Sequence, residues 1–318
     1  MRIIFMGTPE FAVESLNTLI KNNYNVVGVV TVPDKPAGRG QQIQQSAIKK
    51  YALENNLKLL QPEKLKDENF IAELEELKAD LQFVVAFRML PEVVWNMPKM
   101  GTYNLHASLL PKYRGAAPIN WAIINGEKES GVTTFKLKHE IDTGNILFQQ
   151  KVNIENGTTA GELHDKLMIT GADLILKTAK EINKSFESGN EPDFLLQKEE
   201  EVCHAPKIFK EDCLIDWSKT AIEINNRIKG LSPYPTAYAH FRNGDGNLQT
   251  LKIFNSKYEL DNVFQPNGSL LTDNKNFLKV YCEDGLIEIT EIQLQGKKKM
   301  LVPEFLRGFT IKDDAQFI

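Results

Sequence analysis

The chain has 318 residues, of which 42% are hydrophobic and 25% are charged, and its formal net charge is −4. This length predicts two domains, and the composition excludes a disordered chain and a small disulfide-stabilised protein. The charge balance is not that of a protein whose whole surface binds nucleic acid. The apolar runs are far shorter than the ~20 residues of a membrane-spanning helix, so we expect no membrane association.

The first half of the sequence alternates apolar strand segments with amphipathic helical segments. The expected elements are a strand over 2–6, a helix with Thr8 as N-cap and Pro9 at its first position, a strand over 25–31, helices over 43–56 and 67–78, and a strand over 81–87. Strands separated by helices pair in parallel through crossover connections. The sequence therefore predicts an α/β domain with a doubly wound, mainly parallel, Rossmann-like sheet.

The second half changes pattern after a long predicted helix over 160–186. A polar stretch over 187–202 follows it, and we interpret 190–204 as a linker. Beyond the linker, a helix over 218–230 with Ser218 as N-cap comes first. Short strands are then predicted at 237–242, 249–255, 278–282 and 285–293. A small OB-like β-barrel is the expected fold of 205–318, because barrel closure removes exposed sheet edges.

Cysteine usage and the amino terminus indicate the compartment. Cys203, Cys213 and Cys282 are widely spaced and include no CxxC pair, so neither a metal site nor a disulfide framework is expected. The first residues lack the apolar run and cleavage site of a secretory signal peptide. We expect a cytoplasmic protein.

Nucleotide-binding signatures are missing where the fold would place them. The segment 7–12, after the first predicted strand, lacks the second glycine of the GxGxxG fingerprint. The sequence also contains no GxxxxGK[ST] phosphate loop. NAD-dependent or FAD-dependent chemistry is therefore not expected.

The densest polar segment in a strand–loop–strand setting is 101–118. Asn104 and His106 lie two residues apart, so an extended backbone points both side chains to one face. An amide and an imidazole suit a carbonyl oxygen that becomes negative, because both can donate to it. Asp142 is the best candidate to orient the imidazole. From the pattern alone, a histidine in a strand is more often a structural residue than a catalytic one.

At this point the sequence resembles the folate-dependent formyltransferases, and within them the branch that acts on methionyl-tRNA. The resemblance rests on the Asn-x-His pair, on Ser108-Leu109-Leu110-Pro111 and on the Asp-Thr-Gly turn that begins at Asp142. Further segments resemble that branch, and they lie at 1–16, 30–40, 204–217, 230–239 and 293–308. The resemblance therefore spans nearly the whole chain.

The resemblance implies a role for each matching residue. Asn104, His106 and Asp142 are the implied catalytic residues, with Asn104 and a protonated His106 holding the oxyanion. The implied folate contacts are Ser108, Leu109, Leu110 and Pro111. The implied tRNA contacts are Lys35, Arg39, Lys297, Lys298 and Lys299, although isolated lysines of this kind are also typical of a solvated surface.

The resemblance also implies the reaction and the domains. The formyl group of 10-formyltetrahydrofolate, a co-substrate, passes to the α-amine of methionyl-initiator tRNA, and no metal takes part. Residues 1–189 form the catalytic domain and 205–318 a tRNA-binding barrel. A monomer is expected.

Two departures from the family pattern and two alternatives stay open. Gln41-Gln42 replace basic residues of the family, which weakens expected phosphate contacts, and Phe87-Arg88 replace a Tyr-Gly pair. One alternative is a formyltransferase that acts on a sugar-nucleotide amine with the same residues. The other is a non-catalytic RNA-binding protein on an α/β scaffold.

Overall fold

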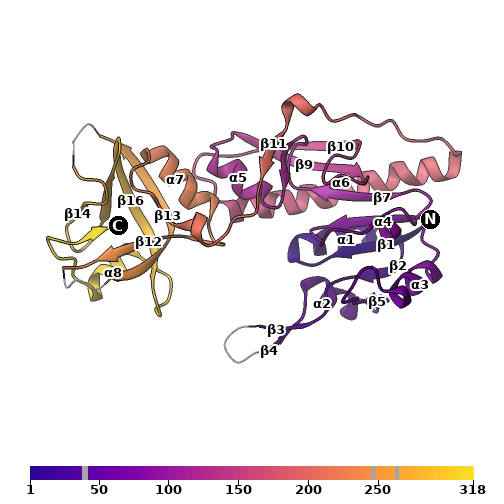
Figure 1. Ribbon diagram of the computed structural model, residues 1–318, viewed down its shortest axis with the longest axis horizontal. Helices are drawn as coiled ribbons and strands as arrows, with labels where there is room; N and C mark the ends of the chain where they lie inside the picture. Colours follow the sequence, from indigo (N-terminus) through magenta and orange to yellow (C-terminus); the bar gives the residue numbers. More distant parts are fainter. Residues whose placement is uncertain (38–41, 245–247, 262–264) are drawn as a thin grey trace. The chain divides into compact units, whose positions relative to one another are not determined.

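A computed structural model describes residues 1–37, 42–244, 248–261 and 265–318 (Figure 1). The chain divides into two compact units. The first unit contains residues 1–115, 129–153 and 164–204, and the second contains residues 116–128, 154–163 and 205–318. Arg39 and Gln41 lie outside the described residues.

The first unit is built on one seven-stranded sheet. Its strands, in spatial order, are β10 (Ile146–Asn153), β9 (Glu129–Lys136), β7 (Thr102–His106), β6 (Leu81–Val85), β1 (Arg2–Gly7), β2 (Asn25–Val30) and β5 (Leu59–Leu60). Pairing is parallel from β7 to β5 and antiparallel where β9 and β10 join. The predicted α/β class with a mainly parallel sheet is confirmed.

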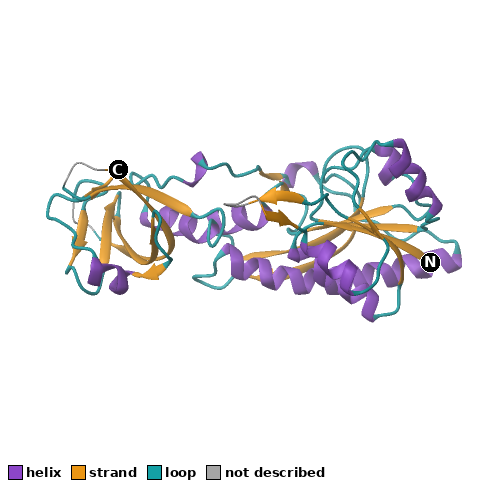
Figure 2. Ribbon diagram, turned by 90° about the horizontal axis from the view of Figure 1, so that it is seen from below, coloured by secondary structure: helices purple, strands orange, loops and turns teal. Residues whose placement is uncertain are grey.

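Helices lie along both faces of this sheet (Figure 2). They are α1 (Glu10–Lys21), α2 (Ala47–Glu54), α3 (Glu68–Glu76), α4 (Glu92–Trp95) and α6 (Ala160–Ser188). On one face, Ile4, Met6 and Val84 pack against Phe70 and Leu74 of α3. On the other face, the Thr134 hydroxyl of β9 bonds to the Thr178 hydroxyl of α6 at 2.8 Å. Strand alternation thus buries successive residues against different helices.

Two predicted helix starts are wrong for local reasons. Pro9 is the N-cap of α1 and no side chain caps that helix, so Thr8 does not act as its N-cap. Helix α2 begins at Ala47 because the Ser46 hydroxyl accepts from the Lys49 amide. The residues before it form the strand β4 (Gln42–Gln44), which pairs with β3 (Lys35–Ala37).

The second unit is a nearly closed antiparallel barrel, as predicted. Its strand order is β14 (Leu270–Thr272), β15 (Leu278–Cys282), β16 (Gly285–Leu294), β13 (Leu248–Leu260), β12 (Ala237–Arg242) and β18 (Gln316–Phe317), with β17 (Met300–Leu301) beside β16. A bridge between Ser269 and Gln316 joins the two ends of this order. Such closure leaves little unpaired strand edge.

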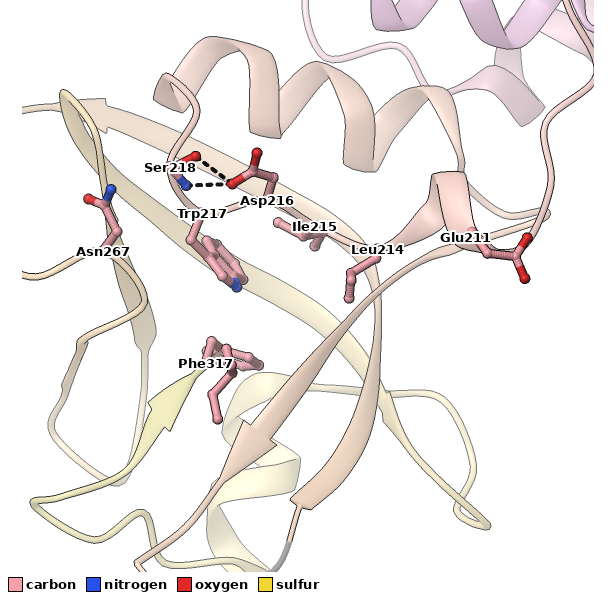
Figure 3. A pocket seen from close by; sticks show the side chains of 9 residues that line it. Glu211, Leu214, Ile215, Asp216, Trp217, Ser218, Asn267 and Phe317 are labelled. Atoms are coloured by element: carbon pink, nitrogen blue, oxygen red, sulfur yellow. Dashed lines mark hydrogen bonds between the residues drawn. The ribbon is translucent and has the colours of Figure 1, made fainter.

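Three helices belong to the second unit: α5 (Pro118–Ile124), α7 (Ala221–Gly230) and α8 (Val302–Gly308). The predicted N-cap of α7 is wrong, because Thr220, two residues after Ser218, is the N-cap and forms a capping box with Glu223. Ser218 instead donates its hydroxyl to the Asp216 carboxylate at 2.6 Å (Figure 3). Among the described residues, no helix is long and apolar enough to cross a membrane.

A pocket of the barrel unit lies beside this Ser218–Asp216 bond (Figure 3). Its walls include the apolar side chains of Leu214, Trp217 and Phe317. The Trp217 and Phe317 rings pack with their centroids 5.2 Å apart, so both rings also belong to the barrel core.

Candidate active site

Three parallel strands end together at one edge of the sheet. The register pairs Gly7 of β1 with Val85 of β6, and Val85 with Leu105 of β7. The chain moves from β1 to β2 on one side and later adds β6 on the other side of β1. Ligands of open α/β sheets bind beyond the carboxyl ends of strands at such a change of direction.

Asn104 and His106 lie in β7 at this edge, as the sequence predicted. They are two residues apart on one strand, so their side chains share a face of the sheet. Asn104 is partly exposed, and no hydrogen bond to its amide is found among the described residues. His106 is buried, with 7% of its surface exposed. The amide is therefore available to a substrate, whereas the imidazole is enclosed.

Both ring nitrogens of His106 face protein groups. Nε2 lies 2.8 Å from the Tyr113 carbonyl oxygen, and Nδ1 lies 3.9 Å from Asp142 Oδ2. A carbonyl oxygen only accepts, so Nε2 carries the proton of this bond. In the neutral ring Nδ1 is then the nitrogen without a proton, and it faces the Asp142 carboxylate.

The short strand β8 (Lys112–Gly115) aligns this pair. Tyr113 has a φ of +61°, and its carbonyl binds His106. Two residues later, the Gly115 amide donates to Asp142 Oδ2 at 3.1 Å. One strand therefore holds the imidazole with a carbonyl and the carboxylate with an amide. Neither contact involves a side chain of β8, which explains why the residue pattern did not reveal them.

Two further residues of the site were missed by sequence reasoning. Gln197 Nε2 donates to the main-chain carbonyls of Asp142 and Gly144. The Arg114 guanidinium binds both Gln197 Oε1 and the Glu199 carboxylate. Gln197 falls in the predicted polar linker over 190–204, and the sequence predicted no role for Arg114. Side-chain bonds to distant carbonyls leave no periodic signal that could have identified them.

Comparison with known proteins identifies the chain. Residues 1–178 match the formyl transferase family, and residues 207–310 match the formyl transferase C-terminal domain. The chain belongs to the formyl transferase family. It is 53% identical over 314 residues to a methionyl-tRNA formyltransferase of Bacteroides thetaiotaomicron, covering 98% of this chain and 97% of that protein.

Other relatives extend this result. A methionyl-tRNA formyltransferase of Flavobacterium johnsoniae is 52% identical over 316 residues and is covered over 98% of its length. Among solved structures, the sugar 3N-formyl transferase WlaRD superposes with a TM-score of 0.63 at 24% identity, over 94% of this chain and 99% of that one. HypX from Aquifex aeolicus, in complex with tetrahydrofolic acid, gives 0.62 at 19% identity, over 98% of this chain and 48% of that one. At these identities, the two solved structures show that this chain shares their fold.

The loop 108–111 of this formyl transferase turns most of its side chains inward. Ser108, Leu110 and Pro111 are buried, and the Ser108 hydroxyl donates to the Lys112 carbonyl at 2.6 Å. Leu109 alone of the four is partly exposed. Any contact of this loop with a ligand would therefore use the main chain or Leu109.

Arg88, one of the departures from the family pattern, is tied to the protein. Its guanidinium donates to the carbonyls of Glu63 and Pro62. Burial lowers the pKa of Arg88 from its usual value, and the side chain lies over the Phe87 ring at 5.6 Å. Arg88, three residues beyond the end of β6, is thus half-buried and bonded to main-chain carbonyls.

The basic residues assigned to tRNA have different environments. Lys35 in β3 is exposed, as are Lys297 and Lys298 in the loop between β16 and β17. Lys299 forms an ion pair of 2.9 Å with Glu291 and lies over the Phe254 ring, so its charge is partly compensated. Among the residues that the structure describes, no cluster of three or more His, Cys, Asp or Glu could hold a metal ion.

Proposed function

We propose that this chain transfers the formyl group of 10-formyltetrahydrofolate to the α-amine of methionyl-initiator tRNA. The observation that carries the proposal is the convergence of Asn104, His106 and Asp142 at the carboxyl edge of β7. The methionyl-tRNA formyltransferases with more than half of their residues identical support the choice of acceptor, because the identity covers both domains. A sugar-nucleotide acceptor has support only from structures that share the fold.

The first step is attack of the amine nitrogen on the formyl carbon. An α-amine has an ordinary pKa of about 7.7–8.0, so a usable fraction is neutral at pH 7. The attack converts the formyl oxygen into an oxyanion, which needs a hydrogen-bond donor within reach. Asn104 supplies that donor, because its amide has no bond to another described residue. His106 Nε2 is less suited to this task than the sequence suggested, since it already donates to Tyr113.

The second step moves one proton from the amine to the folate. The attacking amine must lose a proton, and N10 of the folate must gain one before the carbon–N10 bond breaks. His106 Nδ1 takes up the proton and returns it to N10, directly or through a water, while Asp142 stabilises the transient imidazolium. The products are formylmethionyl-tRNA and tetrahydrofolate, and the proton count balances.

The same proposal assigns the remaining surfaces. The loop 108–111 contacts the folate donor, and Lys35, Arg39 and Lys297–Lys299 contact tRNA phosphates. Each phosphate contact adds to the salt dependence of binding. We further infer that the chain acts as a monomer in the cytoplasm. Light scattering at micromolar concentration tests the monomer, and a mass of twice the chain overturns it.

A transfer assay tests the function. Purified protein, 10-formyltetrahydrofolate and methionyl-initiator tRNA are mixed, and formylmethionyl-tRNA is measured. The wild type is expected to form the product, and His106→Ala is expected to form far less. Lys21→Ala, at the far end of α1 and exposed, serves as the control for handling and folding.

Two results would change the assignment. Formylation of an amino-sugar nucleotide without formylation of the tRNA would keep the active site and replace the acceptor. Binding of tRNA and folate with no turnover for either acceptor would favour the non-catalytic RNA-binding alternative.

A further inference from the structure

The turn that carries Asp142 needs external support. Asp142 has a φ of +54°, in the left-handed region that non-glycine residues rarely occupy. Such a conformation persists only where surrounding contacts fix it. The turn also passes so close to β9 that a Cβ on Gly144 would lie 1.8 Å from the Lys136 carbonyl oxygen. The position of the Asp142 carboxylate therefore depends on what holds this turn.

One amide group holds the turn at two points. Gln197 Nε2 lies 2.9 Å from the Asp142 carbonyl oxygen and 2.8 Å from the Gly144 carbonyl oxygen. An amide nitrogen has two protons, so both bonds can form together. The two bonds bracket Thr143 and tie the two ends of the turn to one side chain.

The other end of the same amide is fixed by Arg114. Gln197 Oε1 accepts from Arg114 Nε at 3.0 Å and from Nη2 at 2.8 Å. This pairing forces the amide nitrogen toward the Asp142 turn, because the oxygen is the only acceptor of the side chain. Arg114 is 7% exposed and lies between Tyr113 and Gly115, the residues of β8 that bind His106 and Asp142.

The charge of this buried guanidinium is balanced by Glu199. Its two carboxylate oxygens accept from Arg114 Nη1 at 3.1 Å and Nη2 at 2.9 Å. The hydrogen bond from Arg114 also lowers the pKa of Glu199, so this carboxylate stays ionised at neutral pH. Paired, fork-like contacts of this kind fix orientation as well as charge.

We propose that Gln197, oriented by Arg114, is a positioning residue for formyl transfer. It holds the Asp142 turn so that the carboxylate stays opposite His106 Nδ1. This proposal rests on the function proposed above, since it assigns Gln197 a role in the same proton transfer. The segment 190–204, predicted from the sequence as the linker between two domains, thereby supplies a part of the site through Gln197.

The segment that carries Gln197 has anchors of its own. Leu195 exchanges two main-chain hydrogen bonds with Ile146 of β10, at 2.9 and 2.8 Å. The Phe194 ring stacks on the Tyr103 ring with an interplanar angle of 17°. A substitution at Gln197 should therefore leave the path of the segment unchanged.

The first test is Gln197→Met, which keeps the length of the side chain and removes both the donors and the acceptor. We expect kcat to fall about 10-fold to 100-fold, since small misplacements of a catalytic group have effects of this size. The KM values for tRNA and folate should change less than about 2-fold, because the loss concerns the transition state. Lys198→Ala is the matched control, since Lys198 is exposed and its ammonium pairs with the exposed Glu201.

A structural role predicts a different pattern. If Gln197 only stabilised the fold, Gln197→Met would lower the thermal midpoint and leave the kcat of the folded enzyme unchanged. That result would overturn the proposal. If Gln197→Met does not fold, Gln197→Glu replaces it. The glutamate has the same shape and keeps an acceptor for Arg114, but it has no N–H for the two carbonyls, so the same loss of kcat is expected.

A double-mutant cycle shows whether Gln197 acts through Asp142. Gln197→Met is measured by single turnover in the wild type and in an Asp142→Ala background. A residue that acts only by positioning Asp142 should have no further effect once Asp142 is gone. Losses that multiply would overturn the proposal. An Asp142→Ala variant with normal kcat would instead contradict the proposed catalytic role of Asp142. The hydrogen bonds between Arg114, Gln197 and the turn would not be called into question by that result.

Discussion

Asn104 and His106 occupy one face of one strand, yet they differ in their bonding. The imidazole donates to Tyr113 and faces Asp142, whereas the Asn104 amide has no bond to another described residue. An unpartnered amide that is partly exposed is ready to bind a developing negative charge without breaking an existing contact. An imidazole with a carboxylate beside its Nδ1 is suited to take up and return the proton that moves from the amine to the folate. We therefore propose that Asn104 binds the oxyanion and that His106 transfers the proton.

Substitution of Asn104 tests this division. Asn104→Ala should lower kcat by roughly 10²–10³, because removal of one oxyanion donor has an effect of this size in other enzymes. The thermal midpoint should stay near that of the wild type, since the partly exposed amide has no hydrogen bond to another described residue. Steady-state formyl transfer and calorimetry measure both quantities. A near-normal kcat would contradict the oxyanion role.

Within the Asp142 turn, Gly144 has no room for a side chain. A Cβ there would meet the Lys136 carbonyl oxygen and the Phe135 ring, so the turn would have to move away from β9. Gly144→Ala should lower kcat about 10-fold or more by displacing Asp142.

A second glycine gives the comparison for that variant. A Cβ on Gly308 would have no atom within 4 Å, so Gly308→Ala should leave kcat unchanged. Equal rates for the two alanine variants would show that the turn absorbs the methyl group without moving Asp142.

Among the elements, β9 supports the loop 108–111 through one side chain. The Thr133 hydroxyl donates to the Ser108 carbonyl at 2.6 Å and accepts from the Leu110 amide at 3.2 Å. Gln149 of β10 donates to the same hydroxyl and to the Leu110 carbonyl. The loop that is proposed to contact folate is thus fastened to the two antiparallel strands of the sheet.

Thr133→Val removes this support without changing side-chain shape. It leaves the buried Ser108 carbonyl and the Leu110 amide short of a partner, which should reduce the free energy of unfolding by about 1–3 kcal/mol. Urea denaturation measures the change. Thr134→Val is the control, because its partner Thr178 still donates to the Leu174 carbonyl. Equal losses for the two variants would contradict a special role of Thr133.

For the molecule as a whole, several carboxylates favour folding only while they are ionised. Hydrogen bonds lower the pKa of Asp34, through Lys49 and then Gln61, and of Glu199, through Arg114. Bonds from Ser218, from Thr220 and from the amides of 275–277 likewise lower the pKa values of Asp216, Glu223 and Asp273. A depressed folded-state pKa means that the unfolded chain binds protons more readily, so stability falls as pH decreases.

The thermal midpoint should therefore be flat near neutral pH and decline below about pH 4, where unfolded carboxylates begin to bind protons. Calorimetry between pH 7 and pH 3 measures the decline. Asp273→Asn should make it shallower, because that carboxylate accepts several amide bonds. A midpoint that stays constant to pH 3 would contradict this account.

The sequence was sufficient for what depends on neighbouring residues. The common face of Asn104 and His106 follows from the period of a strand, and the α/β pattern of 1–87 follows from local hydrophobic periodicity. The predicted start of α2 was wrong, because the Ser46 cap sets the boundary and the polar stretch before it is not helical. The barrel class was also visible, since its turns and short strands recur along the chain.

The completed site needed contacts between residues far apart in the chain. Asp142 meets His106 and Gly115, and Gln197 meets Asp142 across 55 residues. The contacts with Gly115 and Gln197 use a main-chain amide and a main-chain carbonyl, which nearly every residue possesses, so no residue type marks them in advance. The polar composition that favoured a linker in this segment includes Gln197, and the side chain of Gln197 fastens the turn. The residue types and their spacing in the sequence indicated the candidate reacting groups. Only the tertiary packing of β8, the Asp142 turn and Gln197 decided how those groups are oriented.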